Sequence, residues 1–115
     1  YSAERYKLAK LLRKYPELGI ILDDVLRSAG GKMVVLFGSY AKFSASPKSD
    51  IDLYINSESG KLKRDVEGIN SRISVKTGGF DTASPLIREI IKNHVILSGI
   101  DEFYEKSGFF EKTLA

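Results

Sequence analysis

The pattern of hydrophobic and polar positions predicts two helices at the start of the chain. Apolar residues recur there at i, i+3, i+4 and i+7, in two groups separated by a proline: Leu8, Leu11, Leu12 and Tyr15, then Leu18, Ile21, Leu22, Val25 and Leu26. This spacing is typical of α-helices that bury one face. A glycine pair at 30–31 follows the second group, and glycine commonly ends a helix. We therefore expect residues 1–29 to form a helical lead-in.

Four later segments are short and apolar, as strands are. They cover residues 32–37, 50–56, 72–77 and 95–97. Further helices are expected at residues 40–45 and 61–71, from Ser84-Pro85 onward, and at residues 101–106. Serine at the N-cap and proline at the first helical position are a common helix start. This order predicts an α/β (α+β) fold, in which a small mixed sheet of about four strands is packed against helices.

The chain has 115 residues, which is the length of a single domain. Within it we distinguish the lead-in from a core over residues 32–99 and a C-terminal helix and tail over residues 100–115. Phe109 and Phe110, in the tail, are expected to be buried because both are large and apolar. The chain begins at Tyr1 rather than Met, which leaves open that it is a fragment of a longer protein.

Composition narrows the class of protein. No apolar run approaches the roughly 20 residues of a membrane helix, and the first ten residues carry four charged side chains, unlike a signal peptide. No membrane association is therefore expected. The absence of cysteine excludes disulfides and cysteine metal sites and fits a cytoplasmic protein. The net charge of +3 suits a phosphate-bearing partner. Nucleic acid is compatible with this charge, but no motif indicates it.

Two carboxylates interrupt the second predicted strand. Asp50 and Asp52 lie two positions apart, and side chains alternate between the faces of a strand. Both carboxylates therefore project from one face, while Ile51, Leu53 and Ile55 anchor the opposite face in the core. Two neighbouring carboxylates repel each other unless a cation lies between them, and Mg²⁺ is commonly held by one or two carboxylates plus substrate phosphates. This pattern predicts a metal site on a rigid element.

A Gly-Ser pair ends the strand before these carboxylates. Glycine lets the backbone approach a ligand closely, and the Ser39 hydroxyl can donate a hydrogen bond to a phosphate oxygen. Ten residues separate Gly38-Ser39 from Asp50. Each half of this pattern is weak alone, because a Gly-Ser after a strand is usually a turn and an Asp-x-Asp is often a solvated strand face. Together they suit a metal-bound nucleoside triphosphate.

The stretch FGSYAKFSASPKSDIDLYI resembles the Gly-Ser-x10-Asp-x-Asp signature of the minimal nucleotidyltransferases, in the DNA polymerase β-like nucleotidyltransferase superfamily. The likeness extends to SPLIREIIKNHVIL and covers residues 32–99. It implies Mg²⁺-dependent transfer of a nucleoside monophosphate from a nucleoside triphosphate, expected to be ATP, to an acceptor hydroxyl. Carried over by position, Gly38 and Ser39 would hold the triphosphate, and Asp50 and Asp52 would be the catalytic metal ligands.

The resemblance also suggests a partner. Minimal nucleotidyltransferases often pair with a helical HEPN protein in toxin–antitoxin modules, where they modify the toxin. An acceptor hydroxyl on such a partner is therefore one expectation. The alternative is a catalytically degenerate nucleotide-binding or regulatory module of the same fold, which could belong to a DNA-binding regulator.

One departure from the family bears on this choice. The family usually has a third carboxylate on the next core strand, and counting back from Ser84 places that position at Lys76. A lysine there could neutralise the aspartate pair without metal or contact phosphate directly. Asp81 is the nearest acid and a candidate replacement, although a turn or capping role fits it better. Lys48 is a further candidate for phosphate contact. His94, the single histidine, is expected to be structural.

Overall fold

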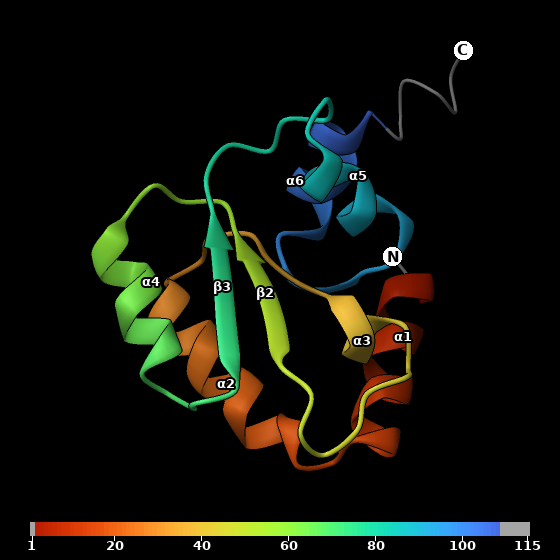
Figure 1. Cartoon of the computed structure of the whole chain (residues 1–115). Coiled ribbons are helices and arrows are strands. Elements are labelled where there is room, and N and C mark those ends of the chain that lie inside the picture. Colours follow the sequence, from red (N-terminus) through yellow and green to blue (C-terminus); the bar gives the residue numbers. More distant parts are fainter. Residues whose placement is uncertain (1, 109–115) are drawn as a thin grey trace.

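A four-stranded sheet with helices on both faces forms the centre of the computed structural model (Figure 1). The structure describes residues 2–108, so the expectation that Phe109 and Phe110 are buried falls outside the described residues. The helices are α1 (Ser2–Lys14), α2 (Leu18–Ala29), α3 (Gly38–Ala41), α4 (Gly60–Glu67), α5 (Pro85–Lys92) and α6 (Ile100–Ser107). The strands are β1 (Val34–Phe37), β2 (Ile51–Ile55), β3 (Ile73–Thr77) and β4 (Val95–Ser98).

The order of helices and strands agrees with the order that the sequence predicts. The largest differences are at helix ends: the helix expected at 61–71 ends at Glu67, and the one expected at 40–45 is the single turn of α3. Ser84 is the extended N-cap residue of α5 and Pro85 occupies its first turn, as the Ser-Pro pair indicates. The segment after α2 turns back through Gly30, whose φ of 58° is left-handed.

The sheet is mixed, and its strand order is β3-β2-β1-β4. β1 is antiparallel to both β2 and β4, whereas β2 is parallel to β3. The parallel pair is joined through α4, because two parallel neighbours need a crossover connection. β1 is therefore an inner strand with neighbours on both sides, and all four of its residues are buried. The predicted small mixed sheet of four strands is confirmed.

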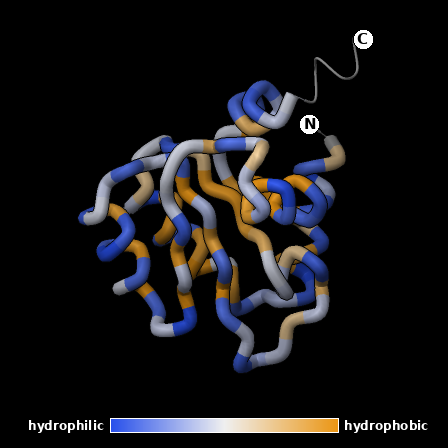
Figure 2. Tube along the Cα trace, turned by 45° about the horizontal axis from the view of Figure 1, so that its top comes forward, coloured by the Kyte–Doolittle hydropathy of each residue, from blue (hydrophilic) through white to orange (hydrophobic). Residues whose placement is uncertain are grey.

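Each face of the sheet has its own hydrophobic cluster. The first cluster joins α1, α2 and α4 to one face, and β2 contributes Ile51, Leu53 and Ile55 to it, as their alternation predicts. The second joins α5 and α6 to the other face, where β1 contributes Val35 and Phe37. The hydrophobic stretches in Figure 2 follow the strands and the inner sides of the helices. In Figure 1, α5 and α6 lie together toward one end, and no helix lies in front of β2 and β3.

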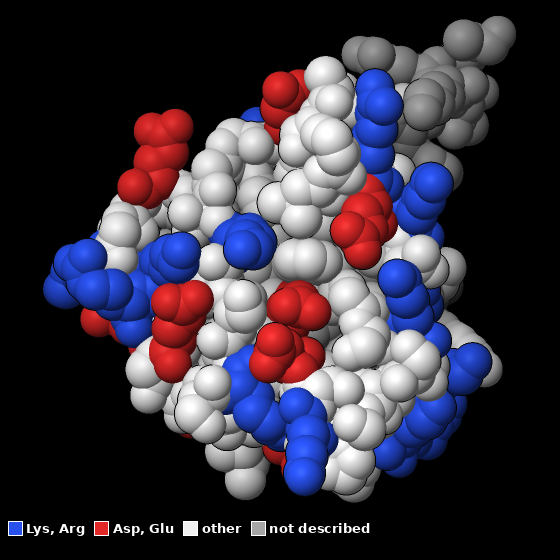
Figure 3. Space-filling view, in the orientation of Figure 1, with Lys and Arg blue, Asp and Glu red and all other residues white. Residues whose placement is uncertain are grey.

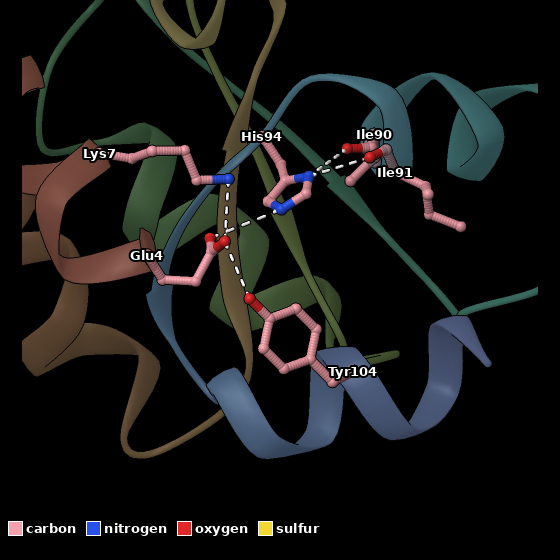
Figure 4. A network of polar contacts seen from close by, with 6 residues as sticks. All are labelled: Glu4, Lys7, Ile90, Ile91, His94 and Tyr104. Atoms are coloured by element: carbon pink, nitrogen blue, oxygen red, sulfur yellow. Dashed lines mark hydrogen bonds and ion pairs between the residues drawn. The ribbon is translucent and has the colours of Figure 1, made fainter. Parts of the chain in front are cut away.

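A buried polar network joins α1 to the end of α5 and to α6 (Figure 4). Glu4 is only 4% exposed. Its Oε2 accepts a hydrogen bond from the Tyr104 hydroxyl at 3.0 Å and forms an ion pair with Nζ of Lys7 at 3.0 Å. Its Oε1 lies 3.5 Å from Nε2 of His94. The other ring nitrogen of His94, Nδ1, lies 3.1 Å from the carbonyl oxygens of Ile90 and Ile91. His94 thus caps the end of α5, which confirms its structural role.

Among residues 2–108, no helix combines the length and the apolar character needed to cross a membrane. The longest helix, α1, has 13 residues, and its sequence includes several lysines and arginines.

Candidate active site

Asp52 lies on the part of the sheet that α5 and α6 leave open. It pairs with Phe37 of β1 on one side and with Ser74 of β3 on the other. Its side chain is partly buried, while Asp50, just before β2, is exposed. Figure 3 looks onto this face and shows acidic side chains grouped near its middle, with basic side chains on both sides. The Asp52 carboxylate on β2 therefore lies at a surface that carries both acidic and basic side chains.

Gly38 brings the two halves of the sequence pattern into contact. Its φ is 75°, and a Cβ atom built on it would lie 2.2 Å from Oδ2 of Asp52. Any other residue would be strained by the left-handed backbone and would also collide with the carboxylate. Ser39 follows in the first turn of α3 and is partly buried. The Gly-Ser turn and the Asp-x-Asp strand, which are ten residues apart in sequence, thus meet directly.

The electrostatic surroundings disfavour the charged form of Asp52. Its pKa is raised above the ordinary value of 3.8, first by burial and next by the negative charge of Asp50. Lys76 lowers the pKa, and Glu89 raises it by a smaller amount. Partial burial and neighbouring negative charges both destabilise the ionised form of a carboxylate. A bound cation offsets both effects and so stabilises the ionised form.

On β3, Ser74 and Lys76 are the residues on the Asp52 side of the strand. The parallel register pairs Asp52 with Ser74 and places Lys76 two residues further along, beside Tyr54. The neighbour of Asp52 on β3 is therefore Ser74, and Lys76 lies on the same side of the strand, two residues further along. That Lys76 occupies the position expected to be acidic stays a prediction. Neither residue is an acid.

Two other predicted site residues lie in exposed connections. Asp81 is exposed, and its Oδ1 accepts a hydrogen bond from the backbone N–H of Ala83 at 2.9 Å, as in an Asx turn. Its carboxylate therefore has a local partner in the connection between β3 and α5. Lys48 is exposed in the connection between α3 and β2, which the Gly-Ser turn and Asp50 bracket.

Comparison with known protein families shows to which family the chain belongs. The family model of the nucleotidyltransferase domain matches residues 18–107, which is most of the chain. The chain belongs to this family. The match includes every residue of the Gly-Ser turn, the Asp-x-Asp strand and β3, so the contact between Gly38 and Asp52 lies within the nucleotidyltransferase domain.

A solved structure shares the fold of this nucleotidyltransferase domain. It is described as "Crystal structure of the toxin-antitoxin with AMP-PNP" and matches with a TM-score of 0.52 at 16% sequence identity. The match covers 95% of this chain and 85% of the other. No curated protein matches the sequence.

Glu89 is an acidic neighbour that the sequence does not reveal. It lies on α5, and its Oε1 is 3.9 Å from Nζ of Lys42, the C-cap residue of α3, so the carboxylate lies on the side of α5 near α3. Its charge also raises the pKa of Asp52 slightly. The sequence predicts the helix, but the face of α5 that meets the site depends on packing between elements far apart in the chain. The only local signal is that Glu89 lies between Ile87 and Ile90, the two buried residues of α5, so its side chain is expected beside the buried face of the helix.

The carboxylates fit a metal ion that arrives with a substrate. Residues 2–108 contain no group of three or more His, Cys, Asp or Glu side chains that could hold a metal ion. Asp52 supplies one carboxylate and Asp50, whose charge acts on Asp52, can supply a second. Mg²⁺ typically takes one or two protein carboxylates and completes its shell with waters and phosphate oxygens. The donor set therefore suits an ion shared with a triphosphate.

Proposed function

We propose that this domain transfers a nucleoside monophosphate from ATP, together with Mg²⁺, to an acceptor hydroxyl. The observation that carries the proposal is the direct packing of Gly38 against the carboxylate of Asp52. A backbone turn suited to phosphate and a carboxylate suited to metal then form one site. Membership of the nucleotidyltransferase domain family supports this chemistry.

Each residue of the site has a specific task in this proposal. Gly38 and Ser39 bind and orient the triphosphate, and Asp50 and Asp52 hold Mg²⁺. When bound, Mg²⁺ neutralises phosphate charge and so favours attack at the α-phosphorus. Lys76 lies close enough to act on the charge of Asp52, and we assign to it a contact with the phosphates. Lys48, exposed beside the same turn, is a second candidate for that contact.

The reaction is a substitution at phosphorus. The acceptor oxygen forms a bond to the α-phosphorus. The bond between that phosphorus and the oxygen that bridges the α- and β-phosphates breaks, and pyrophosphate leaves. The acceptor proton passes to a base. The chain's residues hold the two reactants in line, and in phosphoryl transfer this positioning supplies most of the rate.

We infer that the acceptor hydroxyl belongs to a partner protein, with a helical HEPN-type toxin as the expected class. The whole described chain is used by the nucleotidyltransferase fold and its lead-in, which leaves no separate unit for an acceptor among residues 2–108. The similar solved structure is described as a toxin–antitoxin with AMP-PNP, which agrees with a partner and a nucleotide.

A second candidate function rests on β3. Because Ser74 and Lys76 occupy the strand beside Asp52, no third carboxylate comes from that strand. A domain of this kind would bind nucleotide without transferring it and would act as a regulatory module, for example in a DNA-binding regulator.

A transfer assay separates the two functions. The domain is incubated with Mg²⁺, α-labelled ATP and a candidate partner, and the label on protein is measured. We expect labelling of the partner that falls by about 100-fold or more in Asp52→Asn, because the metal loses a ligand. Asp23→Asn is the matched control, since Asp23 is an exposed aspartate on α2, and it should label normally. Nucleotide binding without transfer would support the regulatory module instead.

A further inference from the structure

Arg72 joins three segments that build the proposed site. It immediately precedes β3, and its Nη1 donates hydrogen bonds to the Tyr40 hydroxyl at 2.7 Å and to the Pro47 carbonyl at 2.9 Å. Its own carbonyl accepts a hydrogen bond from the backbone N–H of Ile51 at 2.8 Å. One residue thus contacts α3, the connection after it and the first residue of β2.

These three contacts involve residues next to both parts of the candidate active site, the Gly-Ser turn and the Asp-x-Asp strand. Tyr40 directly follows Gly38-Ser39, and Ile51 lies between Asp50 and Asp52. The Arg72 side chain therefore holds the turn assigned to phosphate against the start of β3, and its backbone carbonyl joins that point to the strand assigned to metal. Its contact with Pro47 holds the connection between the turn and the strand.

The other side of this connection is held by α1 and the residue after it. Lys14 Nζ donates a hydrogen bond to the Phe43 carbonyl at 2.6 Å, and the Ala45 N–H donates one to the Tyr15 hydroxyl at 3.1 Å. The Tyr15 ring packs edge-on against the ring of Tyr40 at 4.8 Å between centroids. Phe43 has a φ of 58°, a conformation that persists in a phenylalanine only where its surroundings hold it. The connection is thus fixed from two sides.

We propose that Arg72 is a positioning residue that sets the separation between the Gly38-Ser39 turn and the Asp50 and Asp52 carboxylates. This role rests on the proposed transfer function. The planar guanidinium suits it, because its N–H groups point in fixed directions and can serve two acceptors at once. An ammonium group has no such fixed geometry, so lysine restores only part of the clamp.

The expected effect is on the rate of transfer rather than on nucleotide affinity. Displacement of catalytic groups by about 1 Å can cost about 100-fold in rate, while a flexible triphosphate still finds most of its contacts. We expect Arg72→Gln to lower kcat by about 100-fold and to change the Kd of the nucleotide by less than about threefold. Arg72→Lys should recover part of the rate. Tyr40→Phe, which removes one of the bonds but keeps Arg72, should lower kcat by about 10-fold.

The test measures kcat, the Kd of a non-hydrolysable ATP analogue and the melting temperature of these variants, with Arg64→Gln on the exposed surface of α4 as the matched control. A fall in kcat without a matching rise in Kd, partly restored by lysine and visible in Tyr40→Phe, supports the role. A rise in Kd with kcat unchanged would show that Arg72 binds phosphate and would overturn it. Equal rates in Arg72→Gln and Arg64→Gln would overturn it while leaving the transfer function intact. Wild-type protein that binds nucleotide and transfers nothing would overturn both.

Discussion

Glu4 and Asp52 are two partly or fully buried carboxylates with opposite surroundings. Glu4 is held by Lys7 and Tyr104 of its own chain, beside His94 (Figure 4). Asp52 instead has Asp50 and Glu89 as like-charged neighbours and Lys76 as an opposite charge, and it is partly exposed. A carboxylate surrounded by its own partners serves the fold, whereas one that is left beside like charges is suited to a ligand. The comparison assigns α1 a structural role and β2 a functional one.

Removing the Glu4 carboxylate is expected to have the largest effect on stability. Glu4→Ala leaves Lys7 and the Tyr104 hydroxyl without this acceptor at a buried position and also leaves a void. Removing the acceptor of a partly buried hydrogen bond typically costs about 1–3 kcal/mol, and the void adds to this cost. We expect a loss of about 3 kcal/mol in the free energy of unfolding, measured by urea denaturation, with the Kd of the nucleotide unchanged in the folded protein. A large loss of nucleotide affinity in a fully folded Glu4→Ala protein would contradict the claim that Glu4 serves only the fold.

Gly38→Ala should have a smaller effect on stability and a larger one on the site. The added Cβ both occupies a left-handed backbone position and displaces the Asp52 carboxylate. We expect a loss of about 1–2 kcal/mol in the free energy of unfolding, together with at least a tenfold weaker binding of nucleotide. Gly30→Ala is the matched control, because Gly30 has a φ of 58° and open space around its Cβ position. Equal effects of the two substitutions on binding would contradict a contact specific to Gly38.

The pH dependence of stability should come from the α1 network. Burial lowers the pKa of His94 below its ordinary value of 6.5, and Lys7 lowers it further, so the folded state prefers the neutral ring. Protons therefore bind more readily to the unfolded chain, and stability is expected to fall as the pH drops below 6.5. Urea denaturation at several pH values measures this loss, and His94→Gln should reduce it. A wild-type protein that becomes more stable as the pH falls from 7 to 5.5 would show the opposite sign.

The smallest expected effects are shifts in the titration of Asp52. Asp50→Asn and Glu89→Gln each remove a like charge and should lower the pKa of Asp52, with the larger shift from Asp50. Lys76→Met removes an opposite charge and should raise it. NMR titration of the Asp52 carboxyl carbon measures all three. An unchanged pKa in Glu89→Gln would show that α5 does not face the site.

Local patterns in the sequence were enough to predict the elements of the fold and the face of β2 that carries Asp52. The alternation of Ile51, Leu53 and Ile55 correctly places Asp52 on the face opposite the first cluster, because alternation depends only on the strand itself. The spacing between Gly38-Ser39 and Asp50 also predicted that the two segments act together, and in the structure Gly38 lies against the Asp52 carboxylate.

The remaining features depend on contacts between distant segments. The register of β3 against β2, which pairs Ser74 with Asp52 and Lys76 with Tyr54, is set by pairing and packing that no local pattern encodes. The same holds for Glu89 and Arg72, which reach the site from α5 and from the start of β3. Glu4 lies among charged residues on α1, and its burial follows from the docking of α6 and of His94 at the end of α5.

The central claim is that Gly38-Ser39 and the two aspartates form one site for a metal-bound nucleotide. Calorimetric titration of the wild-type chain and of Asp52→Asn with a non-hydrolysable ATP analogue, with and without Mg²⁺, tests it most directly. We expect Mg²⁺ to strengthen binding to the wild type by at least about tenfold and to have little effect on Asp52→Asn, because the ion would lose one of its two carboxylates. Equal affinity with and without Mg²⁺, or the same Mg²⁺ effect in both proteins, would contradict the claim.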